Sequence, residues 1–293
     1  QPSPARRRRR QPRVSNDAAE GQTNAMAAAE RLRGVAVTVL VPTRNEGDNV
    51  DRLLGRLSTH FGETGRSYEV LFVDDSDDET PQVVRRAAAA GEPVRMIHRP
   101  VGRRDGGLAG ALTLGMAQAR GRAVIVMDGD LQHPPEVAES MVAPLLDGPA
   151  QVTVGSRYAA GGSAEGLEYR WRHWASVGSR WLVQFMFRET RRSSDPGGGL
   201  FAIRPEVLAN ATLAPEGYKM LVEILVRGKW EVLVDVPYRF ETRTDGQTKS
   251  TLVEGWNMVK HLVRLWWSTR VGWGPEPAQP RTDGLEILDP AAP

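Results

Sequence analysis

The stretch RAVIVMDGDLQHPPE, residues 122–136, joins an apolar run to two acidic residues. RAVIV has the length and β-branched content of a buried strand, and Asp128 and Asp130 follow it directly. Because alternate residues of an extended chain lie on one side of it, the two carboxylates are expected to lie close together, where they repel each other unless a positive charge separates them. Gln132 and two prolines then turn the chain. The stretch predicts a strand that ends at a cation site, or a turn in which one Asp caps the next helix.

Similar apolar runs recur along the first half of the chain. Strand-like runs at 35–41, 69–74, 94–98, 122–128 and 151–156 alternate with helical patterns at 48–60, 79–90, 107–119 and 135–147. This alternation predicts an α/β fold with a mainly parallel mixed sheet flanked by helices on both faces. In such sheets the ligand lies beyond the carboxyl ends of the strands.

Polar and acidic clusters end three of the predicted strands. VPTRNE (41–46) ends the first, VDDSDDET (73–80) ends the second, and the DGD sequence ends the fourth. We therefore expect carboxylates to converge at one edge of the sheet, which favours the cation site over the simple turn. Asp128, Asp130 and Gln132 offer the hard oxygen ligands that Mg²⁺ and Mn²⁺ prefer, shared with the phosphates of a nucleotide. In the second cluster some side chains cap the following helix, whereas Asp74 and Asp75 are placed to accept hydrogen bonds from a base or ribose.

The rest of the chain divides into tails, an α/β domain and a helix. Residues 1–33 are predicted to be a disordered Arg-rich tail, 34–250 the α/β domain, 251–270 an amphipathic helix at a membrane surface, and 271–293 a Pro-rich disordered tail. Within the domain, helices are expected near 170–187 and 216–227 and a strand near 231–240.

Several function classes lose their support. The chain has no cysteine, no glycine fingerprint of a dinucleotide fold after the first strand, no P-loop, and no metal-binding spacing among its five histidines. Without cysteine a reducing cytosol is the default location. The arginine run at 6–10 stands beside no recognition module, so nucleic acid is not expected as a partner.

Two predicted helices carry tryptophan on an apolar face that also borders cations. The first holds Trp174, Val177, Trp181, Leu182 and Phe185, and the second holds Trp256, Val259, Val263, Trp266 and Trp267. Core packing and a membrane-interface surface are both open for these faces. No apolar run is long enough for a membrane span, so any membrane contact is expected to be peripheral, at the cytoplasmic face.

The motifs together resemble a known family. They are VPTRNE, VDDSDDET, GLAGAL (107–112), MDGDLQHPPE (127–136), GSRYAAGG (155–162), DPGGGLFAIRPEV (195–207), GYKMLVEILVRGKW (217–230) and VPYRFETRTDGQTKS (236–250). In this order and spacing they resemble family 2 glycosyltransferases with the GT-A fold, and among them the dolichol-phosphate or polyprenol-phosphate mannose synthases. The resemblance covers about residues 36–265. It implies inverting transfer of mannose from GDP-mannose to a polyprenyl monophosphate, with a divalent cation, Mg²⁺ or Mn²⁺.

The resemblance also implies roles for individual residues. The residues implied in donor binding are Pro42, Arg44, Glu46, Val73, Asp75, Asp128, Gly129, Asp130, Arg157 and Arg243. Asp128, Asp130 and Gln132 are implied as metal ligands, and Asp130, Arg157 and Arg243 as catalytic residues. Arg172, Ser176 and Lys249 are implied to hold the acceptor phosphate.

The sequence departs from the family at three places. Arg44 stands where an aromatic residue, commonly Tyr, is usual, which keeps open transfer of glucose or N-acetylglucosamine from a UDP-sugar. GGGLF stands where a Ser-Gly-Phe-type segment is usual, which predicts a more mobile acceptor loop. Thr248 replaces the usual serine. A further alternative, from another class of protein, is a nucleotide-binding membrane scaffold without catalysis. The intact DGDLQ sequence disfavours it.

Overall fold

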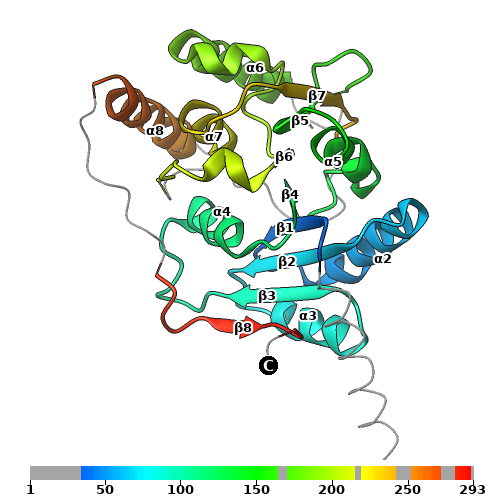
Figure 1. Ribbon diagram of the computed structural model, residues 1–293. Helices are drawn as coiled ribbons and strands as arrows, with labels where there is room; N and C mark the ends of the chain where they lie inside the picture. The colour runs from blue at the N-terminus through cyan, green and yellow to red at the C-terminus, as the bar shows by residue number, and fades with distance from the viewer. Residues whose placement is uncertain (1–33, 164–169, 215–218, 242–251, 272–280, 292–293) are drawn as a thin grey trace, which may run out of the picture.

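The computed structural model describes residues 34–163, 170–214, 219–241, 252–271 and 281–291, which form a sheet flanked by helices (Figure 1). The strands are β1 (Val37–Thr43), β2 (Tyr68–Asp74), β3 (Val94–His98), β4 (Ala123–Val126), β5 (Val152–Ser156), β6 (Phe201–Ile203), β7 (Leu233–Pro237) and β8 (Glu286–Leu288). The α-helices are α2 (Gly47–Thr64), α3 (Thr80–Ala89), α4 (Gly107–Gln118), α5 (Ala138–Leu146), α6 (Arg170–Met186), α7 (Met220–Arg227) and α8 (Leu252–Arg270). Short 3₁₀ helices are η1 (Pro135–Val137), η2 (Arg188–Arg192) and η3 (Pro205–Leu208).

The sheet is mixed, as predicted. Its strand order is β7-β5-β6-β4-β1-β2-β3-β8. Strands β4, β1, β2 and β3 run parallel to one another, and β5 pairs with β7 in parallel. Strand β6 lies antiparallel between β4 and β5, and β8 is antiparallel to β3. The four central parallel strands therefore carry their carboxyl ends to one edge, where the predicted site lies.

Apolar side chains fill both faces of the sheet. One core cluster packs α2, α3 and α5 on one face through residues such as Leu53, Val84 and Met141. The other packs α4 and α7 on the opposite face through Leu112 and Leu221, and Figure 1 shows the two sets of helices on either side of the sheet. The β-branched runs seen in the sequence form these buried strands, since both faces of a parallel sheet are covered.

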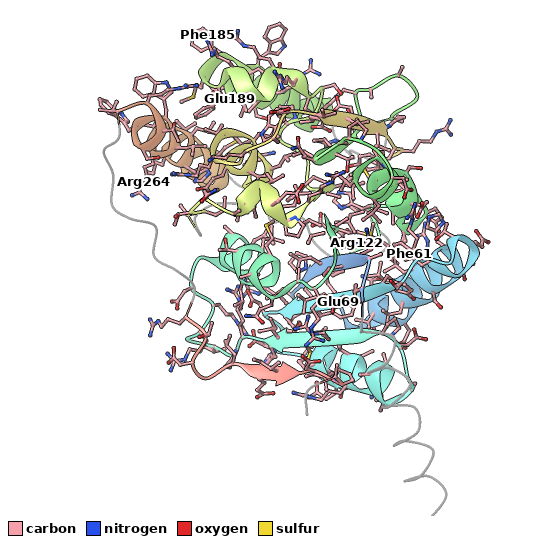
Figure 2. All side chains as sticks on the ribbon, in the orientation of Figure 1. Phe61, Glu69, Arg122, Phe185, Glu189 and Arg264 are labelled. Carbon is pink, nitrogen blue, oxygen red and sulfur yellow. The ribbon has the colours of Figure 1, made fainter. Side chains whose placement is uncertain are left out.

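A buried polar cluster lies at the amino ends of the central strands, at the edge of the sheet opposite to the site. Glu69, labelled in Figure 2, is fully buried and accepts a hydrogen bond from the Thr38 hydroxyl at 2.6 Å. Arg95 donates to the other oxygen of Glu69 at 3.1 Å. This ion pair satisfies the buried charges by pairing and hydrogen bonding.

Helices α6, α7 and α8 pack on one another through a smaller cluster. It contains Val183 and Phe187 from the α6 region, Val222 from α7, and Leu262 and Leu265 from α8. Within the described parts of the chain, every helix is too short or too polar to span a lipid bilayer.

The prediction of a disordered tail over 271–293 is wrong for part of that segment. Strand β8 pairs with β3 in antiparallel register, with Ile287 opposite Ile97. Asp289 accepts hydrogen bonds from Arg120, and Leu288 packs against the core. A short strand in a Pro-rich segment has no local pattern of its own, and it forms here because it covers the edge of β3. Figure 1 shows this red strand beside β3, far from α8.

Candidate active site

The ends of β2, β1 and β4 lie side by side, as the sequence predicts. The amide of Asp75 donates to the Thr43 carbonyl at 2.9 Å, and the amide of Met127 donates to the Leu40 carbonyl at 3.1 Å. These bonds extend the strand pairing to the point where the polar clusters begin. The carboxylates of three loops therefore converge at the carboxyl edge of the sheet.

The loop after β4 places its two carboxylates in different surroundings. The Asp128 side chain is 44% exposed, whereas Asp130 is 5% exposed. One Asp130 oxygen accepts a hydrogen bond from the backbone amide of Gln132 at 3.0 Å. The turn between them requires Leu131 to adopt a left-handed backbone conformation, with φ of 63°. Such a backbone is costly for a residue with a side chain, so the surrounding contacts must hold this turn in shape.

His133 supports this loop from beneath. Its ring is buried, and its Nδ1 accepts the backbone amide of Asp128 at 3.1 Å. An accepting Nδ1 leaves the ring proton on Nε2. The ring also meets Tyr238 and Phe240 edge-on, with centroids 5.8 and 5.9 Å away. A single histidine is more often structural than catalytic, and this contact with the loop is a structural role.

Gly129 brings the first and the third loop together. A Cβ at this position would lie 2.4 Å from Glu46 Oε2 and 3.1 Å from Thr43 Cγ2. Only glycine therefore lets the Glu46 carboxylate approach the loop between the two aspartates. The implied donor residues Glu46 and Gly129 are in contact in the structure.

Cross-hydrogen bonds join the first loop to the second. The amide of Asn45 donates to Ser76 Oγ at 2.8 Å, and the amide of Asp77 donates to Asn45 Oδ1 at 2.9 Å. The amide of Glu46 donates to Thr80 Oγ1 at 3.1 Å. Asp78 accepts the amide of Thr80 at the start of α3, which confirms the capping role expected for this cluster.

The two aspartates at the end of β2 are held by protein groups. Asp74 is fully buried and accepts hydrogen bonds from the hydroxyls of Thr43 and Ser76, with His98 Nδ1 at 2.7 Å, so it serves as an internal anchor and not as the ligand residue predicted. Asp75 accepts from Arg99 through both oxygens, at 2.7 and 2.6 Å. Arg99 belongs to no motif in the sequence and was not predicted.

The other implied donor residues differ in exposure. Pro42 is half-buried at the end of β1, and Arg44 is exposed in the loop that follows. Val73 has no exposed surface, and this burial argues against the nucleotide contact predicted for it.

Nearby, hydrogen bonds from Arg104 hold the pKa of Asp77 below its usual range.

Arg157, after β5, forms a fork with a carboxylate that was not predicted from the sequence. Its Nε and Nη2 donate to Asp195 at 2.8 and 3.0 Å, and both side chains are largely buried. Burial lowers the pKa of Arg157, but the hydrogen bonds to Asp195 and the charge of that carboxylate together outweigh burial, so the pKa is raised. Asp195 opens the DPGGG sequence, whose acidic residue before three glycines was the available signal.

The remaining implied residues lie at the limits of the described chain. Arg243 and Lys249 fall outside the described residues. Arg172 and Ser176 belong to α6, whose side chains are described only from Gly178 onward. Their predicted contacts with phosphate stay predictions.

The donor set fits a metal ion that is shared with a ligand. In the described residues there is no group of three or more His, Cys, Asp or Glu side chains arranged to hold a metal ion. The implied ligand set instead has two carboxylates and the side-chain amide oxygen of Gln132. One of those carboxylates, Asp128, is well exposed. Such a set leaves coordination positions for diphosphate oxygens, which is how Mg²⁺ is commonly bound beside nucleotides.

The two Trp-bearing helices prove to have a buried and an exposed side. Val183 of α6 and Leu262 of α8 are buried, whereas Trp181, Phe185, Trp266 and Trp267 are 66, 80, 37 and 47% exposed. Figure 2 labels Phe185 on α6 and Arg264 on α8. Trp174, Val177 and Trp256 lie outside the described side chains. Val183 and Leu262 were not members of the predicted apolar faces. The described members of those faces lie on the surface, apart from the partly buried Val259.

Comparison with known proteins places these features in a family. Residues 38–210 match the family model described as glycosyl transferase family 2. The chain is 33% identical over 229 residues to a dolichol-phosphate mannosyltransferase from Pyrococcus furiosus, covering 78% of this chain and 63% of that protein. It is 31% identical over 241 residues to the enzyme of that name from Saccharomyces cerevisiae, covering 79% of this chain and 86% of the relative.

A solved structure confirms the fold. Glucosyl-3-phosphoglycerate synthase from Mycobacterium tuberculosis, in complex with Mn²⁺, UDP-glucose and phosphoglyceric acid, superposes with a TM-score of 0.58 at 21% identity. The match covers 86% of this chain and 85% of that one, and it supports the GT-A architecture alone. With the family model matching more than half of the sequence, the chain belongs to glycosyltransferase family 2.

Proposed function

We propose that this enzyme transfers mannose, with inversion, from GDP-mannose to a polyprenyl monophosphate. The observation that carries the proposal is the approach of Glu46 to Gly129, between the two aspartates of the loop after β4. It joins the nucleotide side of the site to the carboxylates that would hold a diphosphate. The relatives at 31–33% identity are dolichol-phosphate mannosyltransferases, which supports this acceptor class.

Asp128, Asp130 and Gln132 would hold the divalent cation. When bound, the metal supplies positive charge for the departing nucleoside diphosphate. The Asp128 side chain is exposed and so is open to a ligand. The buried Asp130 accepts a hydrogen bond from the backbone amide of Gln132. The solved structures of the fold neighbour include complexes with Mn²⁺ and with Mg²⁺.

The chemistry asks little of a general base. A polyprenyl phosphate is already an anion near neutral pH, so its oxygen attacks the anomeric carbon without giving up a proton to the enzyme. The residues of the chain then have to bind two anionic partners, align them and exclude water. Arg157 fits this need, because its guanidinium is fixed by Asp195 and keeps its charge despite burial.

We place the acceptor at a membrane surface, on the cytoplasmic face. The exposed Trp181, Phe185, Trp266 and Trp267 are of the kind that binds at the lipid headgroup level, and Arg264 is exposed beside the α8 pair. Liposome flotation tests this part. Trp266→Ala/Trp267→Ala is expected to lower binding to anionic vesicles several-fold. Unchanged binding of that variant, together with lost binding after deletion of residues 1–15, would assign attachment to the arginine tail.

A second candidate keeps the fold and changes the donor. Arg44 is exposed at the position where relatives commonly have an aromatic residue, and the fold neighbours are solved with UDP or UDP-glucose. Transfer of glucose or N-acetylglucosamine from a UDP-sugar is therefore the alternative.

One assay separates the candidates. The protein is incubated with labelled GDP-mannose, UDP-glucose or UDP-N-acetylglucosamine, a polyprenyl phosphate and Mg²⁺ or Mn²⁺, and label is counted in the organic phase. Label from GDP-mannose supports the proposal, and label only from a UDP-sugar supports the second candidate. Asp130→Asn is expected to lower incorporation at least 100-fold. No label from any donor, with nucleotide binding unaffected by Asp130→Asn, would instead indicate a scaffold without catalysis.

A further inference from the structure

Three consecutive glycines, residues 197–199, lie between Lys219 and Asp128, one of the carboxylates expected to hold the metal. A Cβ on Gly199 would lie 3.2 Å from His133 Cε1 and 3.5 Å from Asp128 Oδ2. Two residues earlier, a Cβ on Gly197 would lie 3.1 Å from Lys219 Nζ. The backbone of this glycine loop, residues 195–199, therefore contacts the site on one side and Lys219 on the other. A loop of glycines has little stiffness of its own, so its position depends on what anchors it.

Lys219 supplies one anchor. Its ammonium group donates to the Gly197 carbonyl at 2.7 Å. Lys219 immediately precedes α7, whose first residues Met220 and Leu221 are buried in the core. Its burial and the neighbouring Arg157 lower the pKa of Lys219 to about 8. A lysine placed there at such an electrostatic cost, directly before a helix buried in the core, indicates a role beyond surface charge.

Two further anchors hold the ends of the glycine loop. Asp195 is fixed by the Arg157 fork, and its carbonyl accepts the Gly198 amide at 3.0 Å. At the other end the Leu200 carbonyl accepts the Gly155 amide at 2.9 Å, where β6 begins. Only the middle of the loop, at Gly197, depends on Lys219.

We propose that Lys219 is a positioning residue that holds the glycine loop against Asp128 during sugar transfer. The proposal rests on the proposed function, because the step that it supports is transfer from the metal-bound diphosphate. The nucleotide base is expected near Asp75 and Arg99, at the end of β2, two strands away from β4. Loosening the glycine loop should therefore slow transfer and leave nucleotide affinity intact.

The experiment compares three variants with a matched control. Lys219→Met removes the ammonium group, and Lys219→Arg restores a cation. Gly197→Ala keeps the lysine but places a Cβ 3.1 Å from its Nζ, so that the end of the lysine side chain must shift slightly. The control is Lys229→Met, an exposed lysine whose loss changes the net charge equally. The readouts are kcat, KM for each substrate, GDP affinity with Mn²⁺, and hydrogen–deuterium exchange over residues 195–200.

We expect Lys219→Met to lower kcat at least tenfold, to change GDP affinity less than twofold, and to speed amide exchange in the glycine loop. Lys219→Arg should recover part of the lost rate. Gly197→Ala should lower kcat and speed loop exchange in the same direction but by less than Lys219→Met, and it serves as the test if Lys219→Met folds poorly. Equal kcat in Lys219→Met and Lys229→Met, or unchanged exchange at the loop, would overturn the proposal. If the wild type transfers no sugar at all, the proposed function fails, and the exchange data still decide whether Lys219 holds the loop.

Discussion

The guanidinium of Arg99 holds both carboxylate oxygens of Asp75, with Nε–Oδ1 and Nη2–Oδ2 distances of 2.7 and 2.6 Å. Arg99 also donates to the carbonyls of Asp105 and Gly107, at the start of α4. One buried side chain thus joins the end of β2, where the nucleotide is expected, to the start of the helix that covers one face of the sheet. The carboxylate is fixed in a single orientation before any ligand binds.

Removing one partner of this buried pair should be costly. Arg99→Met is expected to lower the free energy of unfolding by about 3 kcal/mol, because it leaves the Asp75 carboxylate buried without its partner. The double variant Arg99→Met/Asp75→Asn should recover part of that loss. Urea denaturation of the single and double variants measures both effects.

The control for this cycle is an exposed ion pair. Arg85 contacts Glu286 at 2.6 Å, with side chains 41 and 60% exposed. Arg85→Met should cost less than about 1 kcal/mol, as exposed pairs usually do. Equal losses of unfolding free energy from Arg85→Met and Arg99→Met would show that the buried Arg99–Asp75 pair stabilises the fold no more than an exposed pair does.

A methyl group at Gly129 should impair the donor site. In Gly129→Ala the new Cβ forces the Glu46 carboxylate away, since it would lie 2.4 Å from Oε2. We expect KM for the nucleotide sugar to rise about tenfold or more, because about 1.4 kcal/mol of lost binding suffices for that change.

The matched control for Gly129→Ala is Gly55→Ala. Gly55 lies within α2, and a methyl group added there would have no neighbouring atom within 4 Å. That variant should keep wild-type kinetics and gain up to about 1 kcal/mol of stability. A normal KM in Gly129→Ala would show that Glu46 has no part in donor binding.

The central strands and the acidic loops were predictable because each has a local signal. An apolar β-branched run such as the one before Met127 predicts a buried strand, and a carboxylate directly after it falls at the sheet edge. Strands β6 and β8 have no such signal. Each is three residues long, next to Gly-rich or Pro-rich sequence, and each forms because a distant strand offers an unpaired edge.

The ion pairs of the site were not predictable for the same reason. Asp195 lies in the DPGGG sequence and Arg99 in no motif, and only the tertiary structure brings them to Arg157 and Asp75. Lys219 lies within the GYKMLVEILVRGKW motif, but nothing in that motif indicates a contact with the glycine loop. Sequence reasoning named candidate ligand residues, and it missed the residues that hold several of those side chains in place.

The C-terminal strand should stabilise the sheet edge in a pH-dependent way. Asp289 accepts from Arg120 and lies 3.4 Å from Arg95. Burial raises the pKa of Asp289, but the hydrogen bonds from Arg120 and the Ala291 amide, together with the charges of Arg95 and Arg120, outweigh burial and leave the pKa lowered. A lowered pKa means that this stabilisation is present above the unfolded value of about 4 and is lost as pH falls through the folded value. Asp289→Asn should therefore lower stability at pH 7 by about 1–2 kcal/mol and have less effect near pH 3.

Thermal and urea unfolding at both pH values measure this difference. Asp283→Asn serves as the control, since its side chain is 66% exposed and pairs with Arg103 at the surface. It should change stability little at either pH. A loss in Asp289→Asn that is the same at pH 7 and pH 3 would rule out ionisation of Asp289 as the cause.

Lys219 should leave a signature in the alkaline range. Its folded-state pKa of about 8 lies below the ordinary 10.5, because burial and Arg157 disfavour the ammonium form. Between these values the unfolded chain binds more protons than the folded one, so the wild type becomes more stable as pH rises through this window. Lys219→Met lacks this gain, whereas the other titrating groups are common to both proteins. The difference in unfolding free energy, wild type minus Lys219→Met, should therefore increase from pH 8 to pH 10.5 and stay level below pH 7. Urea titrations at closely spaced pH values measure it, with the exposed Lys229→Met as a control expected to show no such trend. A level difference across the window would mean that the Lys219 ammonium is as well solvated in the folded enzyme as in the unfolded chain.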